Sequence, residues 1–427
     1  MNRDNQRTHK DRIAILQYNI NKSGPTINSL LNHPDSETLA ILAIQEQHRN
    51  PKTQAPLTHQ SWTIIEPPPS QEKTRPRAAI YINNRILSPE SYQPIHYPST
   101  DVIIMEIKIE EKHPMLLINV YNTKGTPLIN DLATYLRTHR RRHRYSTIMI
   151  AGDFNLHHPL WNPPSYEAHD QEAADLIDLM TANGLNPTLP AGTITFPRKK
   201  TAIDLVWGNA LMEQSAIKCK IAKKHDHGSD HLPIITILNL KPEIRTQTPT
   251  FNYDKTDWNM LKTKVEEYLP KNTTANTPPT PTSVDRLAQD ITDAIRKAIQ
   301  CSTPRKVTCP FSKRWWNEDL TEKRKEVNRL RNRHRREGNS EEEDEEWKEA
   351  LKEYRKMIKK AKEDTWRTFV EEADETTIWK VKKYIDTSPT TTFIPTLNGT
   401  ATSNEQKAEI FKRTFFRQPP PAELSDI

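Results

Sequence analysis

Short apolar runs recur along the first 240 residues of the chain, separated by polar segments that are rich in proline. Each run spans five to eight residues, and several are apolar at consecutive positions rather than at alternate ones. Uninterrupted apolar runs of this length are typical of strands that are buried on both faces. The predicted strands are residues 13–18, 39–45, 78–82, 102–109, 115–121, 147–153, 203–207 and 232–238.

Helical patterns lie between these runs, at residues 26–32, 127–141 and 171–183. The last of them ends at Asn183-Gly184, a pair that is typical of a helix C-terminus. Because helices and strands are interspersed, the pattern predicts an α/β or α+β domain built around substantial sheets. A segment of this length is long enough to bury a sizeable core.

The pattern changes after residue 240. Residues 241–309 are rich in Thr, Pro and Asn, which indicates a linker, and residues 284–299 within it predict one short helix. Residues 310–427 are helical and highly charged. We therefore predict three parts: a domain at residues 1–240, a Pro/Thr-rich linker at 241–309 and a charged helical region at 310–427.

The charged region predicts two antiparallel helices joined at Gly338-Asn339. The earlier helix, near residues 323–336, is rich in arginine. The later helix has a narrow apolar seam, because its apolar residues recur at spacings of four and three. The seam residues are Trp347, Leu351, Tyr354, Ile358 and Ala361.

Composition narrows the possible functions. The formal net charge of +7 is compatible with a polyanionic partner such as nucleic acid. Cys219, Cys301 and Cys309 form no C-x-x-C pair, so we expect neither a disulfide framework nor a structural zinc site. The N-terminus lacks the apolar core of a signal peptide, and no apolar run approaches the roughly 18–20 residues that span a bilayer. We expect a nuclear or intracellular protein with no membrane partner.

Five short motifs follow or end the strand-like runs, where functional side chains of sheet proteins converge. They are YNIN, IQE, NVY, GDFN and SDH, which begin at Tyr18, Ile44, Asn119, Gly152 and Ser229. Their residue types suit the hydrolysis of a phosphodiester. Glu46, Asp153 and Asp230 offer the oxygen ligands that a hard cation prefers, and Asp153 with Asn155 is suited to orienting or deprotonating a water molecule.

The developing negative charge of the transition state needs hydrogen-bond donors, and the metal with four side chains could serve: Asn19, Tyr121, Asn155 and His231. Asp204 is the candidate carboxylate that holds the His231 imidazole. Each motif alone has a plainer interpretation, because an Asp after a strand is usually a turn former and a His beside an Asp is usually a surface pair. The joint occurrence of the motifs, in order and next to strands, favours the catalytic interpretation.

Over residues 13–240 this joint pattern resembles the apurinic-endonuclease-like branch of the endonuclease/exonuclease/phosphatase superfamily. It most resembles the endonuclease domain of non-LTR retrotransposon polyproteins. The resemblance implies a deoxyribonuclease I-like four-layer α/β sandwich, followed here by a linker and a helical connector. It also implies Mg²⁺ as the cofactor, with Mn²⁺ as a substitute, and a cut that leaves a 3′-hydroxyl. The site residues matched to the family motifs are Asn19, Asn21, Glu46, Tyr121, Asp153, Asn155, Thr195, Asp204, Ser229, Asp230 and His231.

DNA is the partner that the resemblance implies, and element RNA is a further candidate. Asn21, Thr195 and Ser229 are expected to contact DNA. The same is expected of the basic residues between Thr195 and Asp204, which are Arg198, Lys199 and Lys200. In the relatives this interval forms a hairpin that touches the DNA groove; here it is short, so a role in target specificity stays open.

Three alternatives to a retrotransposon endonuclease remain at this stage. One is an abasic-site repair endonuclease, one is a phosphatase acting on inositol lipids, and one is a catalytically inactive remnant that only binds nucleic acid. Residues 310–427 are similar to the connector that precedes the reverse transcriptase in retrotransposon polyproteins, and no Y-x-D-D polymerase motif is present. The sequence predicts neither the target site nor the oligomeric state.

Overall fold

The computed structural model describes residues 12–67, 75–110, 112–139, 146–242, 251–269, 281–305, 315–336, 341–374 and 404–415. Two six-stranded mixed sheets form from the first 242 residues. The order of the first sheet is β11 (Ala216–Ile221), β12 (Ile234–Leu238), β1 (Ile13–Asn19), β2 (Ile41–Gln45), β4 (Ala78–Asn83), β3 (Trp62–Ile65). The order of the second is β5 (Tyr92–Ile95), β6 (Val102–Ile107), β7 (Met115–Tyr121), β8 (Thr147–Asp153), β10 (Asp204–Asn209), β9 (Leu185–Pro187).

Each predicted apolar run overlaps one of these strands, so the prediction of eight strands is confirmed. The four strands that the pattern did not predict, β3, β5, β9 and β11, are the four edge strands of the two sheets. An edge strand is short or partly exposed, so it does not need a continuous apolar run. In β11, for example, no residue of Ala216–Ile221 is buried.

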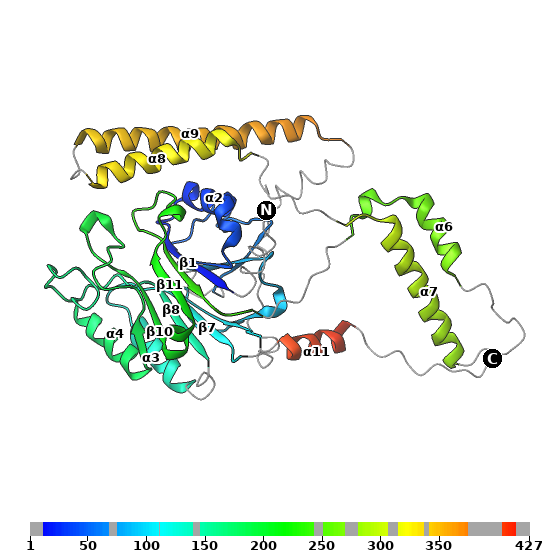
Figure 1. Cartoon of the computed structure of the whole chain (residues 1–427), viewed down its shortest axis with the longest axis horizontal. Coiled ribbons are helices and arrows are strands. Elements are labelled where there is room, and N and C mark those ends of the chain that lie inside the picture. The colour runs from blue at the N-terminus through cyan, green and yellow to red at the C-terminus, as the bar shows by residue number, and fades with distance from the viewer. Residues whose placement is uncertain are drawn as a thin grey trace, which may run out of the picture. The chain divides into compact units, whose positions relative to one another are not determined.

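The two sheets pack face to face, with helices on their outer faces (Figure 1). One core cluster joins Ile13 and Ile15 of β1 to Leu117 of β7 and fills the space between the sheets. A second cluster lies between the first sheet and α2 (Gly24–Asn32), and a third lies between the second sheet and α3 (Leu128–Thr138) with α4 (Gln171–Ala182). The predicted four-layer α/β sandwich is confirmed.

The alternation along β1 explains how one strand serves two layers. Ile13 and Ile15 belong to the core between the sheets, whereas Leu16 and Tyr18 pack under α2. Because successive side chains of a strand point to opposite faces, an uninterrupted apolar run is what a doubly covered strand requires. A short helix, α5 (Ala210–Ser215), connects β10 to β11 and was not predicted.

Residues 246–310 form a compact unit of their own. It contains α6 (Trp258–Tyr268) and α7 (Pro281–Ser302). The prediction of a linker with a single short helix was therefore wrong, because α6 was not expected. The N-cap of α6 is Asp257, whose side chain accepts a hydrogen bond from Met260 N, a local signal that the composition argument overlooked. The residues between these two helices lie outside the described residues.

Residues 311–427 belong to the same compact unit as residues 1–245. They form α8 (Glu318–Arg336), α9 (Glu341–Glu371) and α11 (Asn404–Phe415). The predicted seam is confirmed, since Tyr354 and Ile358 are buried against Leu320 and Leu330 of α8. The joint at Gly338-Asn339 lies outside the described residues. In the described part of the chain, no helix is long and apolar enough to cross a membrane.

Candidate active site

The register of the second sheet places three predicted site residues in one row. Tyr121 at the end of β7 pairs with Asp153 at the end of β8, and Asp153 pairs with Asp204 at the start of β10. Strands β7 and β8 are parallel and β10 is antiparallel, so two strand ends and one strand start meet at the same edge of the sheet. This edge positions the three side chains without any need for long loops.

The first sheet contributes further site residues from the opposite side. Strand β1 lies between β2 and β12, so the segments that carry Glu46 and Asp230 flank the end of β1. Asn21, just after β1, donates from Nδ2 to Asp230 Oδ2 at 3.1 Å. The Tyr121 hydroxyl donates to Glu46 Oε1 at 2.6 Å and so joins the two sheets at the site.

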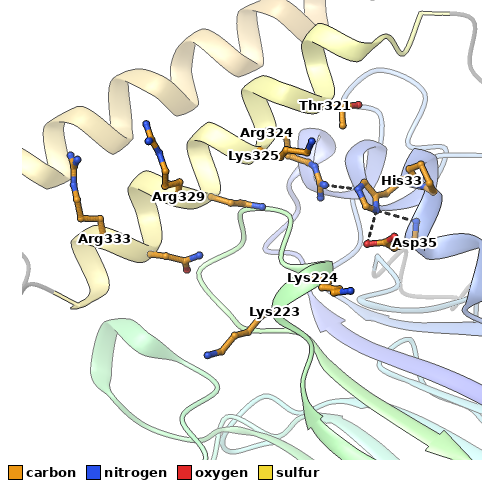
Figure 2. Close-up of a pocket in the computed structure, with 12 residues that line it drawn as sticks. His33, Asp35, Lys223, Lys224, Thr321, Arg324, Lys325, Arg329 and Arg333 are labelled. Atoms are coloured by element: carbon orange, nitrogen blue, oxygen red, sulfur yellow. Dashed lines mark hydrogen bonds and ion pairs between the residues drawn. The ribbon is translucent and has the colours of Figure 1, made fainter.

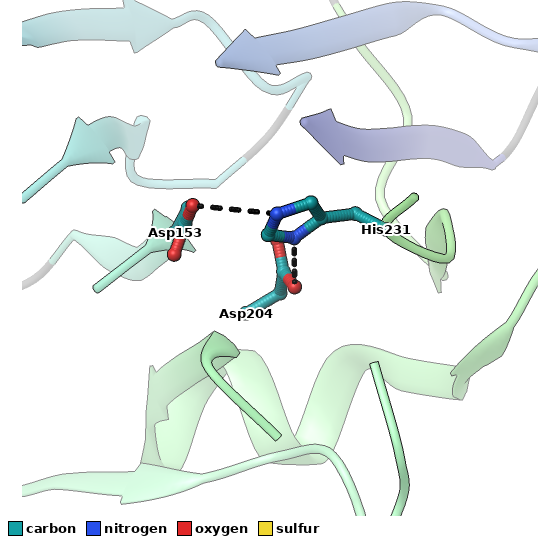
Figure 3. Close-up of side chains that lie close together, drawn as sticks. All are labelled: Asp153, Asp204 and His231. Atoms are coloured by element: carbon teal, nitrogen blue, oxygen red, sulfur yellow. Dashed lines mark hydrogen bonds and ion pairs between the residues drawn. The ribbon is translucent and has the colours of Figure 1, made fainter. Parts of the chain in front are cut away.

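The centre of the site is a buried histidine–aspartate pair (Figure 3). His231 Nδ1 donates to Asp204 Oδ2 at 2.8 Å, and His231 is only 6% exposed. The other oxygen of Asp204 accepts from Gln17 Nε2 at 3.2 Å. Because both Asp204 oxygens have donors, the carboxylate is fixed and holds the imidazole in one orientation. The sequence-predicted partnership of Asp204 and His231 is present in the structure.

Asp153 lies on the other side of the imidazole. Its Oδ2 accepts from Asn19 Nδ2 at 2.8 Å and lies 3.9 Å from His231 Nε2, and its Oδ1 accepts from Asn155 N at 3.0 Å. The side chain of Asn155 donates to Asn122 O at 2.8 Å, which fixes the turn after β8. The structure therefore brings Asn19, Asp153 and Asn155 together, as the motifs predicted.

Burial shifts the protonation of this cluster. Burial and the nearby charge of Asp204 raise the pKa of the Asp153 carboxyl, although His231 and Asn19 oppose the shift. Burial alone would lower the pKa of His231, but the neighbouring carboxylates, Asp204 foremost, outweigh it and raise that pKa to about 9. The imidazole therefore carries a proton at neutral pH. A proton donor and a carboxylate with raised basicity then lie side by side, as acid–base chemistry requires.

Three of the predicted site residues have left-handed backbone conformations: Asn21 at φ 46°, Glu46 at φ 47° and Asn155 at φ 53°. Such conformations cost energy for residues other than glycine and tend to occur where a side chain must be aimed at a site. Gly152 is required for a different reason. A Cβ at this position would lie 1.9 Å from the Val120 carbonyl oxygen, so only glycine lets β8 approach β7 directly before Asp153.

The predicted metal ligands do not form one cluster. Among the described residues, the group whose ligand atoms lie within 4.8 Å of one another is Asp153, Asp204 and His231. Glu46 and Asp230 lie outside it because each is held at a different flank of β1. Within this buried group the Nδ1 atom of His231 is already bonded to Asp204, so it is not free as a ligand. Glu46 and Asp230 are only partly buried, and on this more open side of the site they offer the oxygen donors that a hard cation prefers.

The expected DNA contacts divide into two sets. Asn21, Arg198, Lys199 and Lys200 are exposed. Thr195 is fully buried, and its Oγ1 accepts from Ile203 N and Asp204 N, so the expectation that it contacts DNA was wrong. Its role is to position Asp204.

Ser229 is a second correction. It is only 4% exposed, and its Oγ donates to Asn19 O at 2.7 Å. Its hydroxyl joins the loop before β12 to the end of β1, and no surface is left for DNA.

Several residues that shape the site were not predicted from sequence. The Phe196 ring lies 4.8 Å from the His231 ring, and Gln17 holds Asp204. The sequence did contain a sign of Gln17's role, since it is a polar residue inside a buried apolar run. Arg331 of α8 gave none. It forms an ion pair with Asp226 and donates to Ser229 O at 3.2 Å. These two contacts fix the loop before His231 against α8.

Comparison with known proteins agrees with this geometry. A family model described as endonuclease-reverse transcriptase matches residues 115–235, which include Tyr121, Asp153, Asp204 and His231. None of the curated proteins matches the chain.

Solved structures similar to the chain include the endonuclease domain of TRAS1, a telomere-specific non-LTR retrotransposon. It is 17% identical, with a TM-score of 0.44, and the match covers 54% of this chain and 99% of that one. An AP endonuclease from Leishmania major is 12% identical, with a TM-score of 0.43 and coverage of 56% and 90%. The APE2 catalytic domain from Xenopus laevis is 15% identical, with a TM-score of 0.43 and coverage of 55% and 94%. The family model extends from the start of β7 into β12, so it covers part of the two-sheet domain.

Proposed function

We propose that this chain is a metal-dependent endonuclease that nicks DNA and leaves a 3′-hydroxyl, as the target-site endonuclease of a non-LTR retrotransposon. The observation that carries the proposal is the Asp204–His231 pair facing Asp153 between the two sheets. The family description, endonuclease-reverse transcriptase, supports the assignment to a mobile element. An enzyme that cuts chromosomal target DNA would act in the nucleus.

The chain's own residues account for the proton movements. Asp153, held by Asn19 and Asn155, accepts a proton from the attacking water. The water oxygen forms a bond to the phosphorus as it loses that proton. The bond from phosphorus to the 3′-oxygen breaks, and that oxygen takes up a proton from solvent, which leaves a 3′-hydroxyl and a 5′-phosphate. His231 donates a hydrogen bond to a phosphate oxygen, where negative charge develops in the transition state. Asp204 keeps the imidazole protonated and correctly oriented.

The donors at the open side of the site fit a divalent cation. Glu46 would hold it, with an oxygen of Asp230 as a second donor, and all of these ligands are of the kind that Mg²⁺ prefers. When bound, the metal supplies a positive charge beside the phosphate. Tyr121 would orient Glu46, because its hydroxyl already donates to that carboxylate. Burial and this hydrogen bond raise the pKa of Tyr121, so its hydroxyl stays protonated as a donor.

Nicking of a supercoiled plasmid by the full chain tests the proposal. We expect nicked circles with Mg²⁺ or Mn²⁺ and none with EDTA. Glu46→Gln removes the charged ligand but keeps the size of the side chain, so it should abolish most turnover while the unfolding temperature changes little. Glu106→Gln, a partly buried carboxylate on β6 away from the site, is the matched control and should nick as wild type does.

Full activity in EDTA, or a fully active Glu46→Gln variant, would rule out the proposed chemistry. End-labelled duplexes then identify the product. A 3′-phosphate end would contradict the proposed bond cleavage. Strong preference for a duplex with an abasic site over intact DNA would favour a repair endonuclease instead.

A further inference from the structure

A wide basic groove lies on the side of α8 that faces the nuclease domain (Figure 2). Its volume is about 940 Å³. The domain contributes two short 3₁₀ helices, η1 (Pro34–Thr38) and η4 (Lys223–His225), and α8 forms the opposite wall. Of the twelve residues that line the groove, six are Lys or Arg and only Asp35 is acidic.

Most of this positive charge is not neutralised by the protein. Lys325 is paired with Glu322, and Arg333 is paired with Glu343. In the described ranges, no ion pair joins a carboxylate to any of the other four cations, which are Lys223, Lys224, Arg324 and Arg329. Lys223, Lys224 and Arg329 are exposed, so their side chains can reach a ligand in the groove.

Arg324 is the most informative of the four, because it is only 6% exposed. Its guanidinium contacts His227 and His33, and its Nε has no hydrogen-bond partner among the residues described. Burial followed by the Arg324 charge lowers the pKa of His33 to about 4, so this neighbour is neutral at pH 7. A buried cation beside neutral partners is costly, and an anion bound in the groove would offset that cost.

The groove lies close to the catalytic histidine along the chain. Lys224 and His231 are seven positions apart, so their Cα atoms are at most about 25 Å apart. Duplex DNA rises about 3.4 Å per base pair, so this bound corresponds to about seven base pairs. One arm of a duplex that is cut at the site is therefore long enough to span this distance.

We propose that the groove between η4 and α8 binds the phosphate backbone of the DNA duplex beside the cut. This inference rests on the proposed function, because it takes the substrate of the active site to be duplex DNA. The helical region after residue 310 thereby supplies part of the DNA-binding surface. It contributes phosphate contacts, which set affinity, and no base contacts, which would set sequence preference.

The test compares two triple variants of the full chain with equal loss of charge. The groove variant carries Lys223→Gln, Lys224→Gln and Arg329→Gln. The control variant carries Arg355→Gln, Lys356→Gln and Lys360→Gln, all exposed on α9 and outside the groove. Binding to a fluorescent 30-base-pair duplex is measured by anisotropy in EDTA between 50 and 300 mM salt.

Each phosphate contact contributes about 0.9 to the slope of log affinity against log salt, so the groove variant should lose about 2 to 3 from that slope. We expect its Kd at 150 mM salt to rise at least tenfold and the control's Kd to stay within about twofold of wild type. Equal effects of the two variants, or no effect of either, would overturn the inference. Tenfold tighter binding of a matched RNA duplex, lost in the groove variant, would show that the occupant is RNA and not DNA.

The plasmid assay separates this inference from the proposed function. If wild type nicks with Mg²⁺ and the groove variant binds and nicks equally well at every salt concentration, only the groove assignment fails. If wild type binds the duplex through the groove but never nicks, only the proposed nuclease function fails. If wild type neither binds nor nicks DNA at 50 mM salt, both are wrong.

Discussion

At the scale of single residues, the chemistry depends on how completely each polar group is held. Asp204 has a donor on each oxygen, from His231 and Gln17, and its backbone N–H donates to Thr195. Asp153 is held in the same way by Asn19 and Asn155. A site fixed by so many partners is preorganised for a transition state, so removing one partner should change turnover more than DNA affinity.

His231 and Asp204 should act as a unit. We predict that His231→Ala slows single-turnover nicking on the order of 10²–10³-fold, the usual cost of losing one transition-state donor. Asp204→Asn should also slow it, because the imidazole loses its orientation and its raised pKa. The double variant should be little slower than His231→Ala alone, since the second change removes a partner that is already absent.

The control for this cycle is His96→Ala, an exposed histidine after β5, which should nick at the wild-type rate. Nicking by His231→Ala within about threefold of wild type, below the effect expected of a transition-state donor, would show that the site assignment is wrong.

At the scale of elements, α8 helps to position the loop at residues 226–229, which leads to His231. Arg331, 1% exposed, pairs with Asp226, and Asn328 donates from its side chain to Asp226 O at 2.7 Å. Asp226 also accepts from the Tyr18 hydroxyl at 3.1 Å. One residue of β1, one loop and one C-terminal helix thus meet at a single carboxylate three residues before Ser229.

We predict that Arg331→Met destabilises the full chain by about 3 to 5 kcal/mol, because it leaves the Asp226 carboxylate buried without its partner. Urea unfolding at pH 7.5 measures the loss. Asp226→Asn in the same chain should recover much of it, since the uncompensated charge is then gone. Arg329→Met, an exposed arginine on the same helix, should change stability by less than about 0.5 kcal/mol. Equal stability of Arg331→Met and wild type would mean that the Arg331–Asp226 ion pair contributes nothing to the free energy of unfolding.

The contact between α8 and the domain should also weaken in acid. Burial first, and then Arg324, lowers the pKa of both His33 and His227. His225, Lys325, Arg331 and Asp35 are the other charged or titratable groups that act on them, and only Asp35 opposes the shift of His33. Because the folded pKa values lie below the unfolded value of about 6.5, the contribution of both histidines to stability is complete above that pH and is lost as pH falls. For His33 the loss continues down to about pH 4.

We therefore expect the wild-type chain to lose more unfolding free energy between pH 7.5 and pH 5.0 than His227→Gln does. The glutamine can still accept a hydrogen bond from Arg324 but cannot take up a proton. Urea unfolding of both proteins at the two pH values gives the difference. Equal losses in the two proteins would contradict a role for these histidines in the pH response.

At the scale of the whole molecule, the cores and the contacts between parts have different characters. Three hydrophobic clusters lie entirely within residues 13–240, and a fourth lies within residues 315–361. The named contacts that join α8 to the domain are polar, through Arg324, Asn328 and Arg331. Each part thus has its own core. The polar contacts between them hold the loop at residues 226–229 and form the groove between η4 and α8.

A chain ending at residue 245 should accordingly fold but nick more slowly than the full chain, because the loop at 226–229 loses Arg331 and the groove loses one wall. A chain ending at residue 374 keeps both helices and is the matched control, expected to nick like the full chain. Circular dichroism reports folding and plasmid nicking reports activity. If the shorter chain nicks at the full rate with the same salt dependence, α8 has no part in the active site.

The sequence by itself determined the central strands of the sheets and most of the residues that the fold brings together at the site. Buried central strands need continuous apolar runs, so those eight were predictable, whereas the four edge strands were not, because an edge has no such requirement. The site motifs were predictable because each lies at a strand end and carries residue types suited to phosphodiester chemistry. Asn19 and Asp153 are 134 positions apart, however, and only the packing of the two sheets brings them into hydrogen-bond contact.

Tertiary structure alone decided which polar residues face solvent and which are internal supports. Thr195 and Ser229 have the composition of DNA-contacting residues, but burial makes them supports of Asp204 and of β1. Arg331 belongs to the helix that the sequence showed only to be rich in arginine. Its pairing with Asp226 could not be predicted, because a local pattern records the spacing of charges along one helix and not the carboxylate that the rest of the fold presents to it.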